Sequence, residues 1–584
     1  MRSNYSSGGY RRRRVSVRSC LILCALCIAF LLLMVALRPV GDPPLDVDFP
    51  SLSLRVVGGE ADIPNPGRSA GNRAGESQKK CATVEEMGEL FQGGFWKESL
   101  RVRTIIREHF DLNEAWHFYV LNWCFLEIHL WESEGHMITF ISGASRVRVL
   151  PPEQFCRHGF VLGKSSEAGF GNEMYKVLTA ATLSIMLNRS LIIGQTRGKY
   201  PFGDYISYSN LTLTLKEVKH LWRRNGCERM YRRRLIMRTD DFMKPSETNV
   251  LCSNWRKWKQ PIIWFQDTTD AMAAQFFLKN IHPEMRNAAS NLFGQPELLQ
   301  SRANVFGELM RVLISPTKDV EEAVNWVIGG GVDPDISLHM RMLTNRSVRA
   351  VWAALNCVRR AMRMQHLTSR PKVVLVSDSP SLIKIITPHL SVFAEVLHFD
   401  FELFKGNISS DDKGLHNLDF RVKDWGPAPR WVAFVDFFLA SRAKYAVISG
   451  AHRRVGTTYA QLAAALAAAY SLGDNSTSSS FSFLSSFQGN LLTEGLRLQV
   501  GWGHVWSRFA GLLSCRHQPS QCAFTPLLPP AWWDGLWQSP IPRDIRRLAA
   551  YGVQLSGFGT VDEDYLRSFC KSRKTVVRTI PFVL

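Results

Sequence analysis

Residues 159–193, GFVLGKSSEAGFGNEMYKVLTAATLSIMLNRSLII, contain the pattern that decides the fold. A short apolar segment at 159–162 is followed by a loop of small residues that ends at Asn172. The next apolar positions have helical spacing, and a second apolar segment follows at 190–193. These helix positions are Met174, Val177, Leu178, Ala181 and Ile185. The order of strand, helix and strand predicts one βαβ unit of an α/β fold.

The same alternation continues along the chain as far as residue 475. We expect these further elements: strands at 335–342, 372–376 and 445–449, and helices at 348–364, 430–442 and 458–470. The segment that follows residue 80 is too long for one core, so we expect it to form two lobes or more. The Ser-rich segment 476–487 is expected to be a surface loop. The Trp- and Pro-rich segment 500–584 is expected to be packed, with a topology that its sequence does not determine.

The first forty residues predict the membrane topology. Residues 20–37 carry no charge and are just long enough to span a bilayer, at about 1.5 Å per helical residue. Arginines at 11–14 and 18 precede this segment, so the N-terminus should stay cytosolic. We expect a cytosolic tail at 1–19, one transmembrane signal anchor at 20–37 and a flexible stem at 38–80. A cleaved signal peptide is the alternative.

This anchor predicts a single-pass type II protein of the Golgi membrane, because a short span suits thin internal membranes. Cysteine usage fits an oxidising lumen, and Cys515 with Cys522 is the most plausible local disulfide. No paired CxxC motifs occur, so no zinc site is expected. Of the N-glycosylation sequons, we take Asn210, Asn407 and Asn475 as candidates.

The chain is strongly basic, with a formal net charge of +20. The densest cluster outside the N-terminal tail consists of Arg223, Arg224, Arg229, Arg232, Arg233 and Arg234. A luminal protein meets no genomic nucleic acid, so we expect no nucleic-acid partner. The excess charge then indicates an anionic small molecule, an acidic glycan or a membrane surface. A plain solvated face is the alternative.

Three loops have the composition of sites for a phosphorylated ligand. In the first, Gly169, Gly171 and Asn172 lead into a helix, whose free amides attract anions or polar sugar groups. In the second, His339 and Arg341 share one face of a strand, about 7 Å apart, so that Arg341 can clamp a phosphate. Alternatively, the first loop is a plain connection, and the strand of the second is an edge strand with one face in solvent.

The third loop joins the strand at 445–449 to the next helix and contains His452, Arg453 and Thr457. A basic loop before a helix N-terminus suits a diphosphate, although a solvated basic loop is equally compatible with the pattern. Asp378 ends another strand, and ligands of parallel sheets bind beyond such strand ends. Asp436 interrupts the apolar face of its helix and therefore needs a partner.

In their order along the chain, these segments resemble motifs of the fucosyltransferase superfamily that includes α1,6-, protein O- and plant O-fucosyltransferases. The resemblance covers about residues 155–470. Its four segments are GFGNEMYKVLTAATLSIMLNRSLII (169–193), LHMRM (338–342), VLVSDSPSLIK (374–384) and FVDFFLASRAKYAVISGAHRRVGTTYAQL (434–462).

The resemblance implies a GT-B glycosyltransferase with two Rossmann-like lobes facing a cleft, inverting and independent of metal or another cofactor. It implies an acceptor-side lobe at 81–330, a nucleotide-sugar lobe at 331–475 and a C-terminal extension at 476–584. GDP-fucose would be the donor, and a glycan or protein hydroxyl the acceptor. His339 and Asp436 would hold the guanine and Arg341 the β-phosphate, while Asp378, His452, Arg453 and Thr457 would complete the donor side. Gly169, Gly171 and Asn172 would line the acceptor side.

The sequence also departs from the family pattern. His452 and Arg453 stand where the family usually has Ser or Thr, and Glu173 replaces a common Gln. Glu173, like Arg341, is a catalytic candidate. Its place at a helix N-terminus also has a structural explanation. The alternatives are therefore a protein of the same fold that uses another nucleotide sugar, or a non-catalytic member that binds glycans or acts as a scaffold. The sequence gives neither the acceptor nor the oligomeric state.

Overall fold

A computed structural model of the chain describes residues 95–111, 147–165, 169–195, 202–241, 249–266, 280–294, 303–341, 348–406 except 366, 368 and 369, 429, 431–449, 457–473, 481–487, 521–524, 555–556, 560–561, 563–573 and 577–583. All of them belong to one compact unit, 75–584, and the other unit is 1–74. The expected anchor and stem lie outside the described residues. Within the described part, no helix has the length and apolarity needed to cross a membrane.

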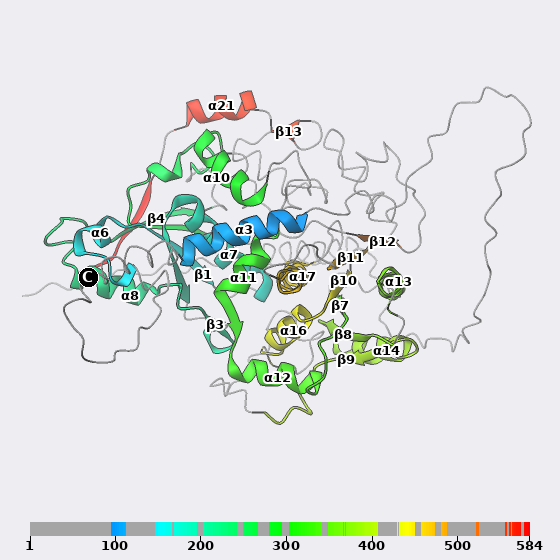
Figure 1. Cartoon of the computed structure of the whole chain (residues 1–584). Coiled ribbons are helices and arrows are strands. Elements are labelled where there is room, and N and C mark those ends of the chain that lie inside the picture. Colours follow the sequence, from blue (N-terminus) through cyan, green and yellow to red (C-terminus); the bar gives the residue numbers. More distant parts are fainter. Residues whose placement is uncertain are drawn as a thin grey trace, which may run out of the picture. The chain divides into compact units, whose positions relative to one another are not determined.

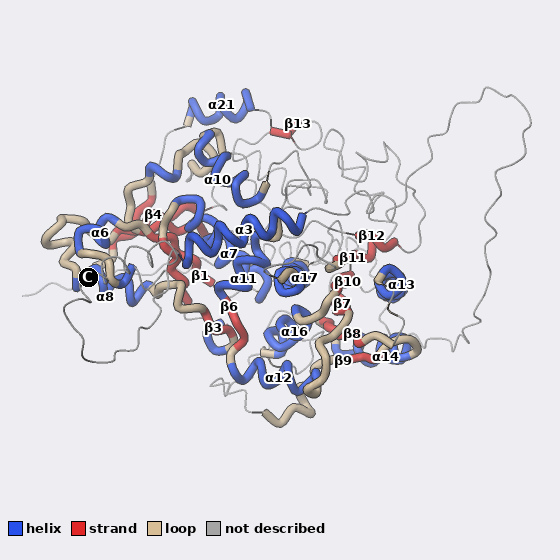
Figure 2. The backbone as a smooth tube through the Cα atoms, viewed as in Figure 1, coloured by secondary structure: helices blue, strands red, loops and turns tan. Residues whose placement is uncertain are grey.

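The first sheet has five strands in the order β15-β4-β5-β1-β2. These are β1 (Phe160–Ser165), β2 (Ser190–Gln195), β4 (Ile236–Asp241), β5 (Ile262–Gln266) and β15 (Arg578–Pro581). All pair in parallel except β15, which runs antiparallel to β4. The strands β1 and β4 of this sheet are labelled in Figures 1 and 2. The predicted βαβ unit is confirmed, because α7 (Phe170–Leu187) connects β1 to β2.

Local sequence explains both ends of α7. Gly169 precedes its first turn, and Asn188 ends it in the left-handed conformation, with a φ of 51°. The Asn188 N–H donates to the carbonyl of Ile185, which satisfies one of the free carbonyls at the helix end. Asn and Gly tolerate this backbone conformation better than other residues.

The second sheet has six strands in the order β9-β8-β7-β10-β11-β12. These are β7 (Ile336–Met340), β8 (Lys372–Ser377), β9 (Glu395–Leu397), β10 (Tyr445–Ser449), β11 (Ser482–Phe487) and β12 (Gln521–Phe524). Only β12 runs antiparallel. In sequence order this is 3-2-1-4-5-6, the strand order of doubly wound nucleotide-binding folds. The expectation of an α/β fold with parallel sheets is thus confirmed.

Helices cover both faces of the second sheet. The connecting helices are α13 (Val348–Met364), α14 (Pro380–Ser391), α16 (Val432–Ser441) and α17 (Thr458–Ser471). Along β8, Val373 and Leu375 belong to the core under α13 and α14, whereas Val374 and Val376 belong to the core under α16 and α17. A strand buried on both faces needs such a continuous apolar run.

The core beneath α17 is shared by both sheets. It includes Phe170 of α7, Ile263 of β5 and Ile448 of β10. Three further helices pack into it: α3 (Phe95–Asp111), α11 (Val305–Leu313) and α12 (Lys318–Ile328). Between α3 and α11, Arg103 forms a buried ion pair with Glu308, at 2.6 Å and 2.9 Å, and also donates to the Ala469 carbonyl of α17.

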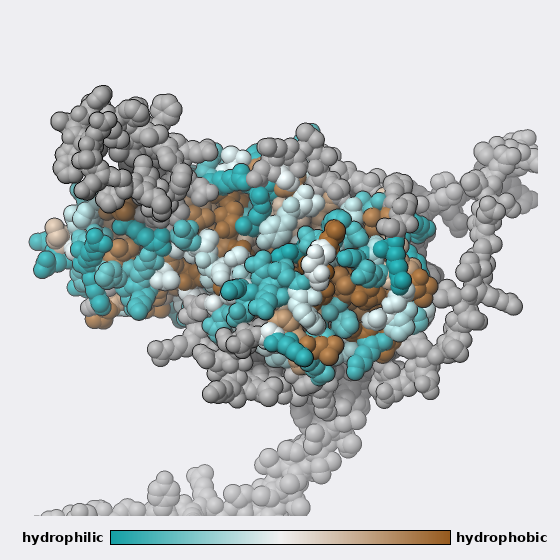
Figure 3. Space-filling view, turned by 60° about the horizontal axis from the view of Figure 1, so that its bottom comes forward, coloured by the Kyte–Doolittle hydropathy of each residue, from teal (hydrophilic) through white to brown (hydrophobic). Residues whose placement is uncertain are grey.

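The shorter elements complete the described chain. They are α6 (Pro152–Arg157), η2 (Phe202–Asp204), β3 (Ile206–Tyr208), α8 (Leu215–Arg224), η3 (Trp255–Lys257), α10 (Pro283–Phe293), β6 (Ile314–Pro316), β13 (Leu555–Ser556), β14 (Thr560–Val561) and α21 (Glu563–Ser572). On the face shown in Figure 3, hydrophilic residues alternate with smaller hydrophobic patches.

The prediction that 476–487 is a surface loop was wrong for its second half. Residues 482–487 form β11, which pairs in parallel with β10 and places Leu484 beside Val447. Phe483 and Leu484 are buried in the cores on opposite faces of the sheet. The Ser-rich composition indicated a loop, but the alternating apolar residues decide the structure.

The prediction of a Cys515–Cys522 disulfide was also wrong. Cys522 of β12 is bonded to Cys357 of α13, 165 residues away in the sequence. The pairing of β12 with β11 brings Cys522 to α13, and only the tertiary fold could reveal this. A second disulfide joins Cys156 to Cys227.

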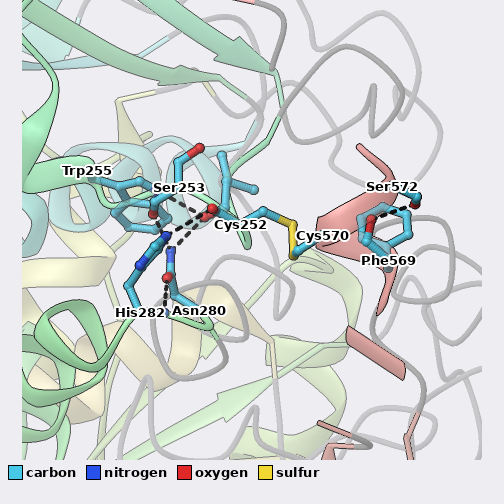
Figure 4. Close-up of a disulfide and its surroundings, with 9 residues drawn as sticks. Cys252, Ser253, Trp255, Asn280, His282, Phe569, Cys570 and Ser572 are labelled. Atoms are coloured by element: carbon cyan, nitrogen blue, oxygen red, sulfur yellow. Dashed lines mark hydrogen bonds between the residues drawn. A yellow bond between two sulfur atoms is a disulfide. The ribbon is translucent and has the colours of Figure 1, made fainter. Parts of the chain in front are cut away.

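A third disulfide, Cys252–Cys570, attaches α21 to the segment that precedes β5 (Figure 4). Around it, the Asn280 side chain donates to the Ser253 carbonyl at 2.9 Å, and His282 Nε2 lies 3.0 Å from the Cys252 carbonyl. The C-terminal segment is therefore joined to the first sheet twice, through this bond and through β15.

Candidate functional site

The second sheet reverses its strand order between β7 and β10, and polar residues gather where these strands end. Arg341 follows β7, and Ser449 is the last residue of β10. The Arg341 backbone N–H donates to the Ser449 hydroxyl at 2.9 Å, which joins the two strand ends. Ligands of open α/β sheets bind at such a reversal, beyond the carboxyl ends of the strands.

The Arg341 guanidinium is held by the neighbouring strand. Its Nη1 lies 2.9 Å from Oδ2 of Asp378, the residue that follows β8. The Asp378 side chain is 4% exposed and that of Arg341 is 17% exposed, so the cation remains accessible from one side. Arg341 and Asp378, two of the expected site residues, thus lie together, and Asp378 contacts the arginine that it helps to position.

His339 occupies the face of β7 that the alternation predicted. Ile336, Leu338 and Met340 pack under α13 and α14, whereas the His339 ring lies 5.4 Å from the ring of Tyr459. Burial, and next the charge of Arg341, lower the pKa of His339 to about 3. His339 is therefore neutral at physiological pH, and its buried Nδ1 has no described partner outside its own residue.

Asp436 lies in the middle of α16, between the buried residues Val435 and Phe437. Burial raises the pKa of this carboxyl to about 8, so it is mostly protonated at neutral pH. Its predicted partner is not present among the described residues. A group with hydrogen-bond donors that reached this carboxyl would favour its ionised form.

Tyr459, in the first turn of α17, is the site residue that sequence reasoning missed. Its ring packs against Phe170 of α7, His339 of β7 and Phe437 of α16, with centroid distances of 5.4 to 5.6 Å. Its hydroxyl donates to the Ala433 carbonyl at 2.7 Å. Tyr459 thus links His339 and α16 to the glycine loop that precedes α7. An aromatic residue at the start of an Ala-rich helix was the only signal for it.

The first turn of α7, at the end of the glycine loop, meets the start of α17 without a gap. A Cβ added at Gly171 would lie 2.6 Å from the Tyr459 nitrogen and 2.8 Å from the Thr458 hydroxyl, so only glycine fits there. The Thr458 hydroxyl also donates to Asn172 Oδ1 at 3.1 Å. Gly169 is exposed, with no neighbouring atom within 4 Å of its ideal Cβ. Gly171 and Asn172 therefore join α7 to α17.

Glu173 is fully buried on α7 and forms an ion pair with Lys176 at 2.9 Å. This position gives Glu173 a structural role, and its catalytic role stays a prediction. The Thr457 hydroxyl caps α17 by accepting from the Ala460 N–H at 3.2 Å. His452 and Arg453 lie outside the described residues.

Two further polar residues can be placed in the structure. Asp335 precedes β7 at the opposite edge of the sheet, where its carboxylate accepts from the Lys372 N–H at 3.0 Å and pairs with Lys444 at 2.9 Å. These contacts give Asp335 a role in the fold. Asn210 is exposed, as a glycosylated residue must be, and Asn407 and Asn475 fall outside the described part.

Comparison with known proteins gives one family. A model described as "Family of unknown function (DUF7810)" matches residues 76–122 and 135–582. No curated protein matches the sequence.

Solved structures with related geometry are fucosyltransferases of low similarity. An Arabidopsis thaliana FUT1 mutant in complex with GDP has 12% identity and a TM-score of 0.34, over 56% of this chain and 70% of its own. NodZ α-1,6-fucosyltransferase from Bradyrhizobium, soaked with GDP-fucose, has 14% identity and a TM-score of 0.30, over 53% and 94%. POFUT1 in complex with GDP-fucose has 11% identity and a TM-score of 0.29, over 56% and 98%. Scores below 0.5 do not establish a common fold, so the site has to be interpreted from its own geometry.

Proposed function

Since this chain belongs to a family of unknown function (DUF7810), we propose its function from the site itself: glycosyl transfer from a nucleotide-diphosphate sugar. The observation that carries this proposal is the position of Arg341. It follows the first strand of a sheet with the doubly wound order, at the strand reversal, and its cation is oriented by Asp378 but still accessible. A diphosphate is the ligand that this position suits.

The neighbouring residues fit a nucleobase better than a second phosphate. His339 is neutral and adds no positive charge, and Asp436 is mostly protonated and adds little negative charge. An Asp436 carboxylate is a suitable acceptor for the ring N–H and the amino group of a guanine. The resemblance of four sequence motifs to fucosyltransferases supports GDP-fucose as the donor.

In the proposed reaction, an acceptor hydroxyl oxygen bonds to the anomeric carbon of the sugar while the bond to the β-phosphate oxygen breaks. The hydroxyl proton leaves to a base or to solvent, and GDP carries away the bonding electrons as negative charge. Arg341 would stabilise this growing charge, which is the usual electrostatic contribution to transfer. The acceptor, a glycan or protein hydroxyl, would enter from the side of Asn172 and Gly169.

The proposal includes the cellular setting expected from the sequence. Residues 20–37 would anchor the chain in the Golgi membrane, with the transferase unit in the lumen. The lobes would be arranged as in GT-B enzymes, and the reaction would need no metal. The exposed sequon at Asn210 agrees with a luminal position, and glycosidase sensitivity of the cellular protein would test it.

Thermal unfolding of the full-length protein in detergent tests the donor class. At a hundredfold excess over its dissociation constant, a ligand adds about 2.7 kcal/mol of stability. We expect GDP and GDP-fucose to raise the unfolding midpoint, and UDP and CMP to have much smaller effects. A rise with UDP alone would point to a different donor. No rise with any nucleotide would contradict the proposal.

A non-catalytic glycan-binding role is the second candidate, and the burial of Glu173 favours it. Its carboxylate cannot reach an acceptor hydroxyl without leaving Lys176, and we identify no other described carboxylate as the base. Release of GDP from GDP-fucose distinguishes the candidates. A transferase releases GDP faster when the acceptor is added, whereas a binding protein does not release it at all.

A further inference from the structure

The arginine cluster at 223–234 lies at the amino edge of the first sheet, where its parallel strands begin. The segment leads directly into β4, and Arg157 and Lys259 precede β1 and β5 in the same way. The antiparallel β15 ends there, with Pro581 beside Ile236. The glycine loop follows β1 at the opposite, carboxyl edge. The cluster therefore lies apart from the site proposed for the donor.

Covalent and hydrogen bonds fix this basic surface in place. The Cys156–Cys227 disulfide joins the end of α6 to the turn after α8. The Arg233 guanidinium donates to the Cys156 carbonyl at 2.7 Å and to the Lys259 carbonyl at 3.2 Å. Three segments of the chain are thus held together before any ligand binds, which lowers the entropy lost on binding.

The charges of this surface are poorly balanced. Residues 152–159 and 223–235 together contain seven arginines but only two carboxylates, Glu153 and Glu228. These two pair with Arg157 at 2.7 Å and with Arg234 at 3.6 Å, both in exposed positions. The exposed arginines without a described carboxylate partner are Arg223, Arg224, Arg229 and Arg232. A bound polyanion would relieve their mutual repulsion.

Repulsion between the positive charges of the cluster affects the pKa of Arg233, whose hydrogen bonds hold the three segments together. Burial, and next the charge of Arg157, lower the pKa of Arg233. Burial, and next the charge of Arg233, likewise lower the pKa of Arg189, which donates to the carbonyls of Gln260 and Pro261. This repulsion agrees with the geometry of the cluster.

The exposed apolar residues favour a sugar polymer over a lipid surface. Met230 and Tyr231, which are 64% and 37% exposed, lie between Arg229 and Arg232. A helix that binds a bilayer needs a free apolar face, but Val218, Leu221 and Trp222 of α8 are buried. A single Tyr ring among guanidinium groups suits a sugar ring with carboxylates, because guanidinium forks match carboxylate geometry.

We propose that this surface, defined by Arg223, Arg224, Arg229, Tyr231, Arg232 and Arg234, binds an acidic polysaccharide. It is separate from the site of Arg341 and does not depend on nucleotide binding. It would hold an anionic glycan chain beside the protein whether or not that chain is also the acceptor.

Binding of the full-length protein to immobilised polygalacturonate tests the proposal, with neutral dextran as the comparison polymer. The test variant combines Arg229→Ala, Arg232→Ala and Arg234→Ala. The matched control combines Lys318→Ala, Lys384→Ala and Lys405→Ala, three exposed residues outside the first sheet, and removes the same charge. Both proteins keep the basic N-terminal tail, so its contribution cancels.

We expect binding to polygalacturonate, but not to dextran, and about a tenfold or greater loss of affinity in the arginine variant, with little change in the control. An Arg→Lys version of the three substitutions should keep part of the binding, because it keeps the charge but loses the fork. An equal loss of affinity in the triple Arg→Ala variant and in the triple Lys→Ala control would overturn the proposal. So would binding to immobilised phosphatidylserine with none to polygalacturonate.

Discussion

The two sheets share a βα architecture but differ at the carboxyl ends of their first strands, β1 and β7. In the first sheet, β1 is followed by a glycine loop that is pressed against α17, so side-chain size decides what fits. In the second sheet, β7 is followed by Arg341 and its partner Asp378, so charge decides what binds. Similar strand ends therefore have different roles: the end of β1 joins two helices, and the end of β7 presents a cation.

Removal of the Arg341 cation should produce the largest effect. We expect Arg341→Ala to lower the rate of GDP release from GDP-fucose by about 100-fold or more, because the leaving diphosphate loses its electrostatic partner. The measurement is the rate of GDP formation with saturating donor. Because Arg341→Ala also removes the ion-pair partner of the buried Asp378, Arg341→Lys serves as a second variant that keeps the charge.

For that prediction to hold, circular dichroism must show an intact fold in Arg341→Lys, and its rate must fall between those of the other two proteins. An Arg341→Ala protein that is folded and fully active would contradict the role of this edge.

A side chain added at Gly171 should lower the stability of the fold and should not change the charge of the site. We expect Gly171→Ala to lower the free energy of unfolding by about 1–3 kcal/mol, since its Cβ would collide with the backbone of Tyr459. Gly169→Ala is the matched control, because the same methyl group there meets no atom within 4 Å and its φ of −63° suits alanine. Denaturant unfolding measures both. Equal losses in the two variants would show that helix α7 does not approach α17 as described.

The polar contact between the same helices should contribute less. Removal of the Asn172–Thr458 hydrogen bond by Thr458→Ala should cost about 0.5–1.5 kcal/mol. A double-mutant cycle with Asn172→Ala isolates the pair, and we expect a favourable coupling energy. Strictly additive single effects would mean that the two side chains do not interact.

The smallest expected effect concerns pH. Burial raises the pKa of Asp436 to about 8, above the value of about 4 in an unfolded chain. Between these values the native state binds more protons, so the contribution to stability is complete below about pH 4 and is lost as the pH rises through 8. Asp436→Asn, which imitates the protonated form, should therefore gain in unfolding midpoint relative to wild type between pH 5 and pH 8.5, by on the order of 2 °C. A difference between the two proteins that does not change with pH would contradict this assignment.

Local patterns in the sequence were sufficient for much of the fold. The alternation in β7 correctly separated His339 from Leu338 and Met340, because a strand places neighbouring side chains on opposite faces. The apolar runs that mark the strands also indicated that Asp378 and Arg341 lie near strand ends. Ligand roles could not be read from this pattern and remain proposals.

Features that depend on distant segments were missed. β11, β12 and β15 find their partners only in the folded sheets, so neither the Ser-rich segment nor Cys522 revealed its pairing. The signal at Tyr459, an aromatic residue at the start of an Ala-rich helix, was too weak, since an aromatic residue on an apolar helix usually belongs to a core. Its contacts with His339 and Phe170 exist only because α7 and α17 begin side by side.

The central claim is that the charged edge of the second sheet binds a nucleoside diphosphate. Calorimetric titration of GDP into the full-length wild-type, Arg341→Ala and Gly169→Ala proteins tests it most directly. We expect one GDP per chain for the wild type and for Gly169→Ala, with affinity reduced by about 30-fold or more in Arg341→Ala. Equal GDP affinity in all three proteins, or no GDP binding by the wild type, would contradict the claim.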